Sequence, residues 1–517
     1  MALALLLAVQ VAAAAAPPQD CQAALGPLYD GIEETALPGQ VDGATLSDAR
    51  ALTALRAERG DALITIKGGD FSGADFHGAR LHNICFLDTN LTGTNWRDAQ
   101  ASGVGFVRAI LANADLRGAR MRRVLLRQPD MKEVDASGAD LSSGRLDGGW
   151  DGSMENVRLD GADLGGFRFE CGITLGDGCP LDGQISIARA NLAGASIDNY
   201  DRFTDWTAAR IDRTEVAIGQ LPDLAAAEIA GPIRVRGGDA VVELSAAEHR
   251  QLLPHMSLPE QAATPSFACA GAATPVERLI CGENGGTLRA LDRDIAELYR
   301  RAGAAAAASQ QAWLGERDRC PLTEGVPDSW CVQQSYERRR EALVARLGPP
   351  AWLRPGATLL FVAPPMQFDE GFRAGPLYRK LLPAILGASW SNVVVRVNRD
   401  GMIDARGDAL GANAHMCSLA GNGLRFDRDT GWYSGLYTPT GEEPAEWRTR
   451  PMPVLLFWGD EAAVYLNGHS NYGAEEGDPR SSDYASCGAR AGFSEMIRVP
   501  VSEAEAARRF EAANDTE

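Results

Sequence analysis

Histidine and cysteine side chains are the first groups in this sequence to test for catalytic or metal-binding chemistry. The six histidines are dispersed, and one of them, His415, lies two residues before Cys417. A tetrahedral metal site needs four clustered ligands, so this pair indicates a loop histidine beside a disulfide. Gly468-His469-Ser470 lacks the G-x-S-x-G spacing of a nucleophile elbow. These groups therefore give no nucleophilic or metal centre.

Carboxylates near the C-terminal end would be the first suspects for an enzyme acting on wall glycans. They are Asp460, Glu461, Glu475 and Glu476. Aromatic residues that could line a glycan groove stand nearby, although packing is the simpler interpretation of them: Trp432, Tyr433, Tyr437 and Trp447. Nothing in the sequence resembles a phosphate-binding loop. We predict a protein that is not an enzyme and that binds no cofactor or metal.

The cysteines number ten, an even count that favours disulfides in an oxidising compartment. They are Cys21, Cys85, Cys171, Cys179, Cys269, Cys281, Cys320, Cys331, Cys417 and Cys487. Sequence alone does not fix their connectivity. Their clustering favours the local pairs 171–179, 269–281 and 320–331, with 417–487 and 21–85 closing longer loops.

Residues 2–16 form a short apolar run that ends in small residues. This pattern predicts a signal peptide over residues 1–16, cleaved between Ala14 and Pro18. The run is too short to span a membrane as a helix. We therefore predict a periplasmic or secreted protein.

The net charge of −19 argues against nucleic acid as a partner, because phosphate binding needs a basic surface. The charge is uneven along the chain. Before Ser266 there are 36 acidic and 23 basic residues, whereas residues 266–347 carry 11 of each. Electrostatic attraction would therefore favour basic partners and act mainly through the N-terminal half.

Residues 69–148 repeat with a period of five, which fits neither an amphipathic helix nor an ordinary strand. Every fifth residue from Phe71 to Leu146 is apolar, and a mostly small residue precedes it by two. Asp or Asn often stands between them, as at Asp75 and Asn95. A fixed short period indicates a stacked array. Four five-residue sides would close one square coil, with apolar side chains inside and polar ones outside.

This pattern resembles the pentapeptide-repeat family, whose motif is A-D/N-L-x-x. Residues 73–81 and 112–121 match it closely. The resemblance implies a right-handed quadrilateral β-helix, which we expect over residues 65–222 with an excursion at 170–184. Residues 17–64 are expected to form a helical cap on its open end, with a helix over 46–59. Residues 223–264 are expected to be a linker with a short helix at 245–253.

Residues 265–348, hereafter the helical module, show apolar stripes at helical spacing around Leu291 and Tyr336. The segment resembles the N-terminal domain of LprI-type lysozyme inhibitors. The matching residues are Phe267, Cys269, Pro275 to Cys281, Leu291, Asp292, Tyr299, Trp313 to Cys320, Cys331, Tyr336, Arg339 and Leu343. The resemblance implies a disulfide-linked helical module and, for some members, lysozyme binding. Trp313, Tyr299 and Tyr336 nevertheless lie in helical stripes, where a core position is the simpler assignment.

Residues 351–510 are expected to form a mostly-β domain after Pro349-Pro350, and residues 502–514 a terminal helix. The whole chain is predicted to be multidomain and mainly β. Its predicted function is protein binding outside the cytoplasm, with lysozyme or another wall-cleaving enzyme as the partner. The alternative is a structural envelope scaffold that uses the solenoid surface and does not bind lysozyme. The sequence leaves open the oligomeric state and the solenoid face that is used.

Overall fold

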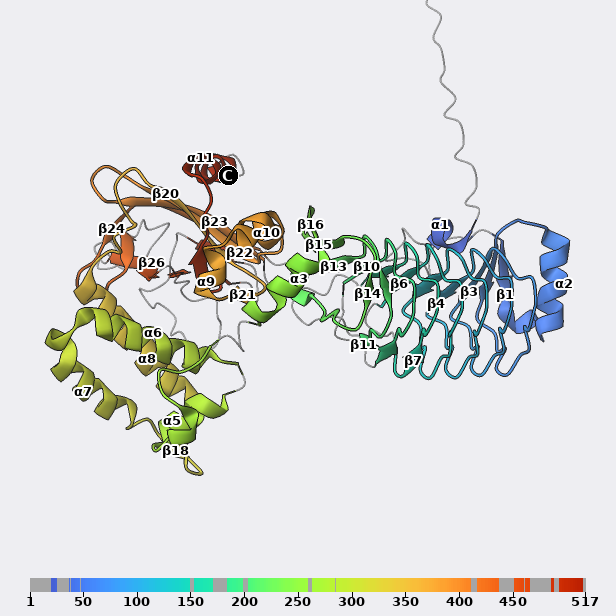
Figure 1. Ribbon diagram of the computed structural model, residues 1–517, viewed down its shortest axis with the longest axis horizontal. Helices are drawn as coiled ribbons and strands as arrows, with labels where there is room; N and C mark the ends of the chain where they lie inside the picture. The colour runs from blue at the N-terminus through green and yellow to red at the C-terminus, as the bar shows by residue number, and fades with distance from the viewer. Residues whose placement is uncertain are drawn as a thin grey trace, which may run out of the picture. The chain divides into compact units, whose positions relative to one another are not determined.

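The computed structural model describes most of the chain (Figure 1). The described residues are 20–25, 37, 39–46, 48–148, 153–170, 184–198, 203–258, 263–283, 285–410, 416–436, 451–459, 461–464, 485–487 and 492–514. Contacts divide the chain into two compact units. The first contains most residues up to Ile233, and the second contains residues from Arg234 onward together with Ala217–Leu221. No helix in the described segments is long and apolar enough to cross a membrane.

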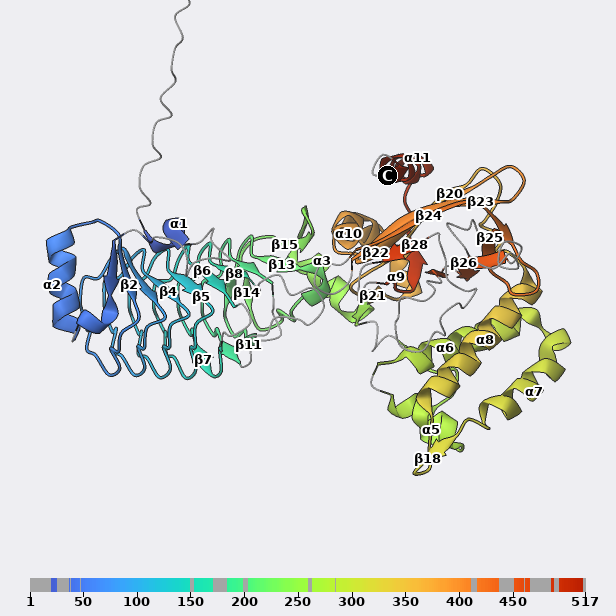
Figure 2. The ribbon, with the colours of Figure 1, turned by 180° about the vertical axis from the view of Figure 1, so that it is seen from behind.

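The first unit is a β-solenoid. Parallel strands stack along one of its faces (Figures 1 and 2). They are β1 (Gln40–Asp42), β2 (Ile64–Lys67), β3 (Ile84–Leu87), β4 (Gly105–Val107), β5 (Leu125–Arg127), β6 (Arg145–Asp147), β8 (Arg168–Glu170), β10 (Ser196–Ile197) and β13 (Glu215–Ala217). Phe86 lies opposite Phe106, and Phe106 opposite Leu126, so one coil takes twenty residues. Four five-residue sides per coil confirm the predicted quadrilateral β-helix.

The other faces are held by isolated bridges and by shorter strands. The bridges step by twenty residues, as in Asp75, Asn95, Asp115 and Asp135. The strands are β7 (Val157–Arg158), β9 (Ile185–Ser186), β11 (Phe203–Asp205), β12 (Arg210–Ile211) and β14 (Glu228–Ile229). The 3-10 turn Ile218–Gln220 follows β13 directly. Later steps are longer, because Asp140 pairs with Asp163 and Asp163 with Asn191. Insertions in the sequence thus leave the stacking intact.

Large apolar side chains fill the interior, and each corner needs a left-handed residue. Phe86 stacks on Phe106 with ring centroids 5.5 Å apart, and Trp96 lies edge-on to both. The residue two positions after each large apolar residue from Phe71 to Leu141 has positive φ. Glycine adopts this conformation without steric cost, yet Arg108 and other non-glycine residues also occupy it. The stacked backbone hydrogen bonds therefore impose the corner conformation.

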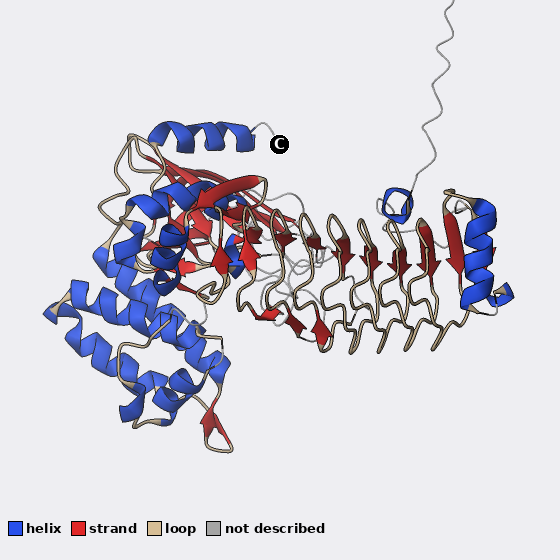
Figure 3. Cartoon of the chain, turned by 45° about the vertical axis from the view of Figure 1, so that its right-hand side comes forward, coloured by secondary structure: helices blue, strands red, loops and turns tan. Residues whose placement is uncertain are grey.

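The N-terminal segment covers the start of the solenoid. The short helix α1 (Cys21–Leu25) precedes the 3-10 turn Gly43–Thr45, and α2 (Ala49–Arg59) lies beyond β1 (Figure 3). Asp48 caps α2 by accepting from the backbone N–H groups of Arg50 and Ala51. Arg56 of α2 donates to the carbonyl of His82 at 2.9 Å. The helix expected at 46–59 thus contacts the first coil and satisfies part of its exposed edge.

The second unit begins with the hairpin β15 (Ile233–Gly237) and β16 (Ala240–Leu244). It continues with α3 (Ala246–Leu252), the 3-10 turn Leu253–His255 and β17 (Met256–Ser257). Ser245 and Glu248 form a capping box at the start of α3. The stretch expected to be a linker is therefore largely folded, and the alternation of its strands is visible in residues 233–244.

The helical module contains four α-helices. They are α5 (Pro275–Gly282), α6 (Thr287–Ala302), α7 (Ala307–Arg317) and α8 (Ser329–Leu347), with 3-10 turns at Cys269–Gly271 and Ala304–Ala306. Between α7 and α8 lies a small hairpin of β18 (Leu322–Thr323) and β19 (Val326–Pro327). Cys269 is bonded to Cys281, and Cys320 to Cys331, the same pairs that the clustering of cysteines favours.

The remaining residues form an antiparallel sheet of nine strands in the order β23-β22-β20-β29-β27-β26-β25-β24-β28. Its strands are β20 (Thr358–Ala363), β22 (Ser391–Val397), β23 (Ile403–Leu410), β24 (Met416–Phe426), β25 (Tyr433–Leu436), β26 (Pro451–Trp458), β27 (Glu461–Val464), β28 (Ala485–Cys487) and β29 (Met496–Arg498). β23 also pairs with β24, so the sheet curls back on itself. The other elements are β21 (Gln367–Phe368), α9 (Glu370–Arg373), α10 (Pro376–Gly387) and α11 (Glu503–Asn514).

The helical module and the sheet share one hydrophobic core. Leu298 and Tyr336 from the helices pack in the same cluster as Trp432, Leu456 and Trp458 from the sheet. The sequence places a boundary at Pro349-Pro350, and residues from both sides of it pack together in this cluster.

Candidate functional site

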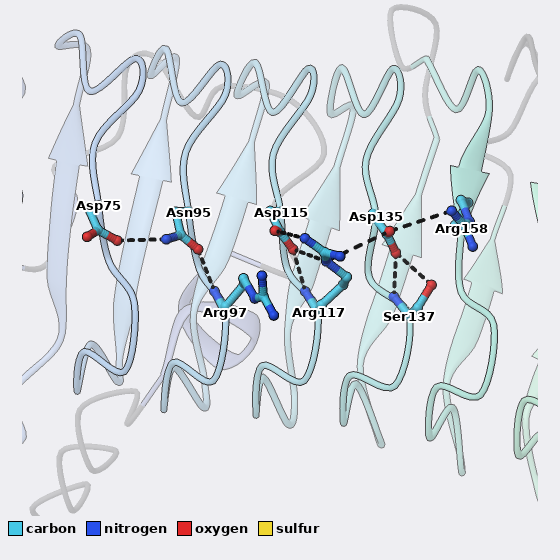
Figure 4. A network of polar contacts seen from close by, with 8 residues as sticks. All are labelled: Asp75, Asn95, Arg97, Asp115, Arg117, Asp135, Ser137 and Arg158. Carbon is cyan, nitrogen blue, oxygen red and sulfur yellow. Dashed lines mark hydrogen bonds and ion pairs between the residues drawn. The ribbon is translucent and has the colours of Figure 1, made fainter.

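The outward-facing row of polar residues on the solenoid is the most regular surface of the first unit. We call Asp75, Asn95, Asp115 and Asp135 the Asx ladder (Figure 4). A side-chain oxygen of each residue accepts from the backbone N–H two residues later, at 3.0 to 3.2 Å. This Asx-turn bond satisfies a backbone donor at the corner of the coil. The Asp or Asn of the repeat is therefore structural.

Neighbouring residues of the ladder also contact one another. Asn95 Nδ2 donates to Asp75 Oδ1 at 2.9 Å. Arg117 pairs with Asp115 at 2.6 Å and reaches Asp135 at 4.0 Å. The hydrogen bond from Arg117 is the largest cause that lowers the pKa of Asp115. Each carboxylate of the ladder is thus paired with an arginine or hydrogen-bonded to an amide neighbour, which holds its side chain in place.

A different face of the solenoid is closed by the N-terminal segment. Cys21 is bonded to Cys85 of β3, and Leu25 packs with outward side chains of the strand face, Leu87, Val107 and Leu125. Buried Arg127 donates to the carbonyl of Leu25 at 2.7 Å and lies 3.3 Å from Asp147. The N-terminal segment therefore covers the part of the strand face that β3, β4 and β5 form.

The residues that carry the LprI resemblance lie mainly inside the helical module. Tyr336 donates to Asp292 at 2.9 Å and accepts from Arg317 at 3.0 Å. Burial is the main cause that raises the pKa of Tyr336. Trp313 packs edge-on against Tyr336 and donates to the carbonyl of Ser335. The aromatic residues of this motif build the core of the module, as the helical stripes indicate.

A cavity of about 1070 Å³ lies within the second unit, lined by both the helical module and the sheet segment. The ionisable residues that line it are His255, Asp369, Arg373, Arg293, Glu337 and Glu495. His255 Nδ1 is hydrogen-bonded to Asp369, and its ring stacks on Phe372. The pairing of His255 with Asp369 was not predicted from the sequence, because the two residues are 114 positions apart. The pair of His255 with Asp369, among lining residues of both charges, does not indicate a particular reaction.

Of the four carboxylates considered for an enzyme, the described part of the chain contains Glu461. Glu461 lies in β27, opposite Trp458 of β26. Trp432 and Tyr433 are buried in two cores of the second unit and do not line a groove. The other candidates lie outside the described residues: Asp460, Glu475, Glu476, His415, His469, Tyr437 and Trp447. Among the residues that are described, no cluster of three potential metal ligands occurs.

The remaining cysteines are partly described. Cys417 is disulfide-bonded, and its backbone lies opposite that of Cys487 in the pairing of β24 with β28. Cys171 and Cys179 lie outside the described residues, as does the predicted signal peptide. The bonds that are seen fit an oxidising compartment.

Comparison with known proteins identifies the repeat region. The family model "Pentapeptide repeats" matches residues 66–93 and 84–128, in eight copies. No curated protein matches the chain.

Several solved structures are similar to the solenoid. Rfr23, a pentapeptide repeat protein from the cyanobacterium Cyanothece 51142, is 22% identical over 17% of this chain and 58% of its own, with a TM-score of 0.16. QnrB1, a plasmid-mediated fluoroquinolone resistance protein, is 17% identical over 33% of this chain and 81% of its own, with a TM-score of 0.17. HetL, a pentapeptide repeat protein from Nostoc sp. Strain PCC 7120, is 20% identical over 32% of this chain and 84% of its own, with a TM-score of 0.16. By the family model, residues 66–128 of this chain are pentapeptide repeats, and they lie in the solenoid.

Proposed function

We propose that this protein is a protein-binding scaffold that works outside the cytoplasm. The observation that carries the proposal is the Asx ladder, whose polar side chains repeat along the coils and are fixed by hydrogen bonds. A rigid surface loses little conformational entropy when a partner binds. Residues 1–16 would act as a signal peptide, and the disulfides support an oxidising destination.

The partner that we propose is a basic lysozyme or another wall-cleaving enzyme. Two features support it: the net charge of −19, which would attract a basic protein, and the LprI-like helical module. Inhibition would follow from occlusion of the enzyme's cleft and would be stoichiometric. The competing function is a structural envelope scaffold in which the solenoid binds another protein and the helical module only stabilises the fold.

Calorimetric titration of the full oxidised chain with a c-type lysozyme tests the proposal, with lysozyme turnover measured in parallel. Saturable binding together with loss of turnover at one equivalent is the expected result. Full turnover at a tenfold excess of the chain, across several lysozyme types, would exclude inhibition and leave the scaffold function.

A further inference from the structure

The loop between α7 and α8 of the helical module carries three exposed apolar side chains. Leu322 pairs with Pro327 and Thr323 with Val326, so Leu322 and Val326 lie on opposite faces of the hairpin and make it apolar on both sides. Eight large apolar side chains are exposed in the described part of the chain, and three of them lie within nine consecutive residues. Leu322 is 58% exposed, Val326 55% and Trp330 65%. Concentrated exposure of apolar side chains on a soluble protein marks a contact surface.

The backbone of this loop is fixed before any partner arrives. The disulfide between Cys320 and Cys331 closes it, with Cα atoms 5.8 Å apart. Glu324 and Gly325 both have positive φ, the conformation of a tight hairpin turn between β18 and β19. Asp328 accepts from the N–H of Cys331 at 2.7 Å and caps α8. The three apolar side chains therefore stand on a rigid support.

The position of the loop also favours contact with another protein. In Figures 1 and 3 the hairpin projects away from the bundle of helices, with β18 at its outer end. The Trp330 side chain begins in the first turn of α8, next to the disulfide. A tryptophan held on a rigid projection can enter a pocket at small entropic cost, and tryptophan is enriched among residues that dominate binding energy.

The charges of the loop indicate what kind of partner would fit. Between Cys320 and Cys331 the charged residues are Glu324 and Asp328, and both are acidic and exposed. An apolar tip flanked by carboxylates complements an apolar hollow whose rim is basic.

We propose that residues 320–331, hereafter the docking loop, insert Leu322, Val326 and Trp330 into a concave, partly apolar site with a basic rim on the partner protein. This inference rests on the proposed function, since it assigns the contact residues of the enzyme-binding activity. The solenoid would then serve as a support or a second contact, and the docking loop would supply the main binding energy.

The test compares full-length oxidised chains in their binding to a c-type lysozyme by calorimetry. Trp330→Ala is expected to weaken binding on the order of tenfold or more. The matched control is Trp390→Ala, which removes another tryptophan of the second unit that is 44% exposed; it should change the Kd less than twofold. Glu324→Gln should weaken binding less and should reduce its dependence on salt.

The possible outcomes separate the docking loop from the proposed function. Wild-type binding by the Trp330→Ala chain would overturn the docking loop and leave enzyme binding in place. Failure of the wild-type chain to bind would overturn both. Sedimentation velocity on the same chains tests whether the loop instead binds a second copy of this chain. Self-association that disappears in Trp330→Ala would show that it does and would overturn the inference. Unchanged circular dichroism of the variant shows that its fold is intact.

Discussion

The indole Nε1 of Trp458 donates a hydrogen bond to Oδ2 of Asp294 at 3.0 Å, which joins β26 of the sheet to α6 of the helical module. The guanidinium of Arg340 lies over the same indole ring, 4.0 Å from its centroid, and pairs with Glu495 at 2.7 Å. Both partners of the indole come from helices of the module. These contacts place a polar network inside the shared core and couple the stability of the module to that of the sheet.

Trp458→Phe should destabilise the second unit. The substitution keeps an aromatic ring but removes the donor to buried Asp294, and an unsatisfied buried acceptor costs about 1–3 kcal/mol. Chemical denaturation should show a lower midpoint for the helical and sheet signals together. Trp390→Phe, at an exposed position, is the control. Loss of the helical signal alone would contradict a common core.

Asp294→Asn should alter how stability depends on pH. Burial is the largest cause that raises the pKa of Asp294, so the folded chain holds this proton more tightly than the unfolded chain does. Such a group makes stability fall as pH rises from the usual aspartate range through the folded pKa. Asparagine cannot ionise and still offers an oxygen to Trp458. The unfolding free energy of the wild type, relative to the variant, should therefore decrease from pH 4 to pH 7. If the difference in unfolding free energy between the wild type and Asp294→Asn stayed constant with pH, the pKa of Asp294 would not be raised in the folded chain.

Asn95 provides a test of the Asx ladder. Asn95→Ala removes the bond to Asp75 and the turn bond from Arg97, so it should cost about 1–2 kcal/mol in thermal or denaturant unfolding of the solenoid. Asn95→Asp keeps the turn bond but places a third carboxylate between Asp75 and Asp115. The loss of unfolding free energy caused by Asn95→Asp should become smaller in about 0.5 M salt, because salt screens repulsion between carboxylates. The loss caused by Asn95→Ala should not change with salt. Gln100→Ala, at an exposed position of the same coil, is the control. Equal salt dependence of both Asn95 variants would contradict this account of the ladder.

The double substitution Cys21→Ser with Cys85→Ser should uncover the strand face. Without the bond, the segment that buries Leu25 against Leu87, Val107 and Leu125 is held only by packing and by polar contacts such as the hydrogen bond from Arg127 to Leu25. Loss of a native disulfide typically costs about 2–4 kcal/mol. Binding of a hydrophobic dye should rise, and the midpoint of solenoid unfolding should fall. Cys269→Ser with Cys281→Ser opens a bond in the other unit and should leave solenoid unfolding unchanged.

The solenoid was predictable because each coil obeys a local rule. A large apolar residue every fifth position fixes which side chains point inward, and the Asp or Asn before it makes a turn bond only two residues away. Because these contacts are local, the five-residue spacing of the sequence is enough to predict them. The covering of the strand face by Leu25 was not predicted, since its bond to Arg127 links residues 102 positions apart.

The core shared by helices and sheet was missed for a similar reason. Trp458 and Asp294 lie 164 positions apart, and nothing local to either residue marks the other as a partner. Pro349-Pro350 follows the end of α8, and residues on both sides of it contribute to the shared cluster. The exposure of Trp330 was not predicted either.

The central claim is that the intact chain binds and inhibits a basic wall-cleaving enzyme. Titration of the full oxidised chain into a c-type lysozyme, followed by heat and by turnover, tests it most directly. The account predicts saturable binding and loss of turnover near one equivalent, weakened on the order of tenfold by Trp330→Ala. Undiminished turnover and no heat of binding at a tenfold excess of the wild-type chain would contradict it.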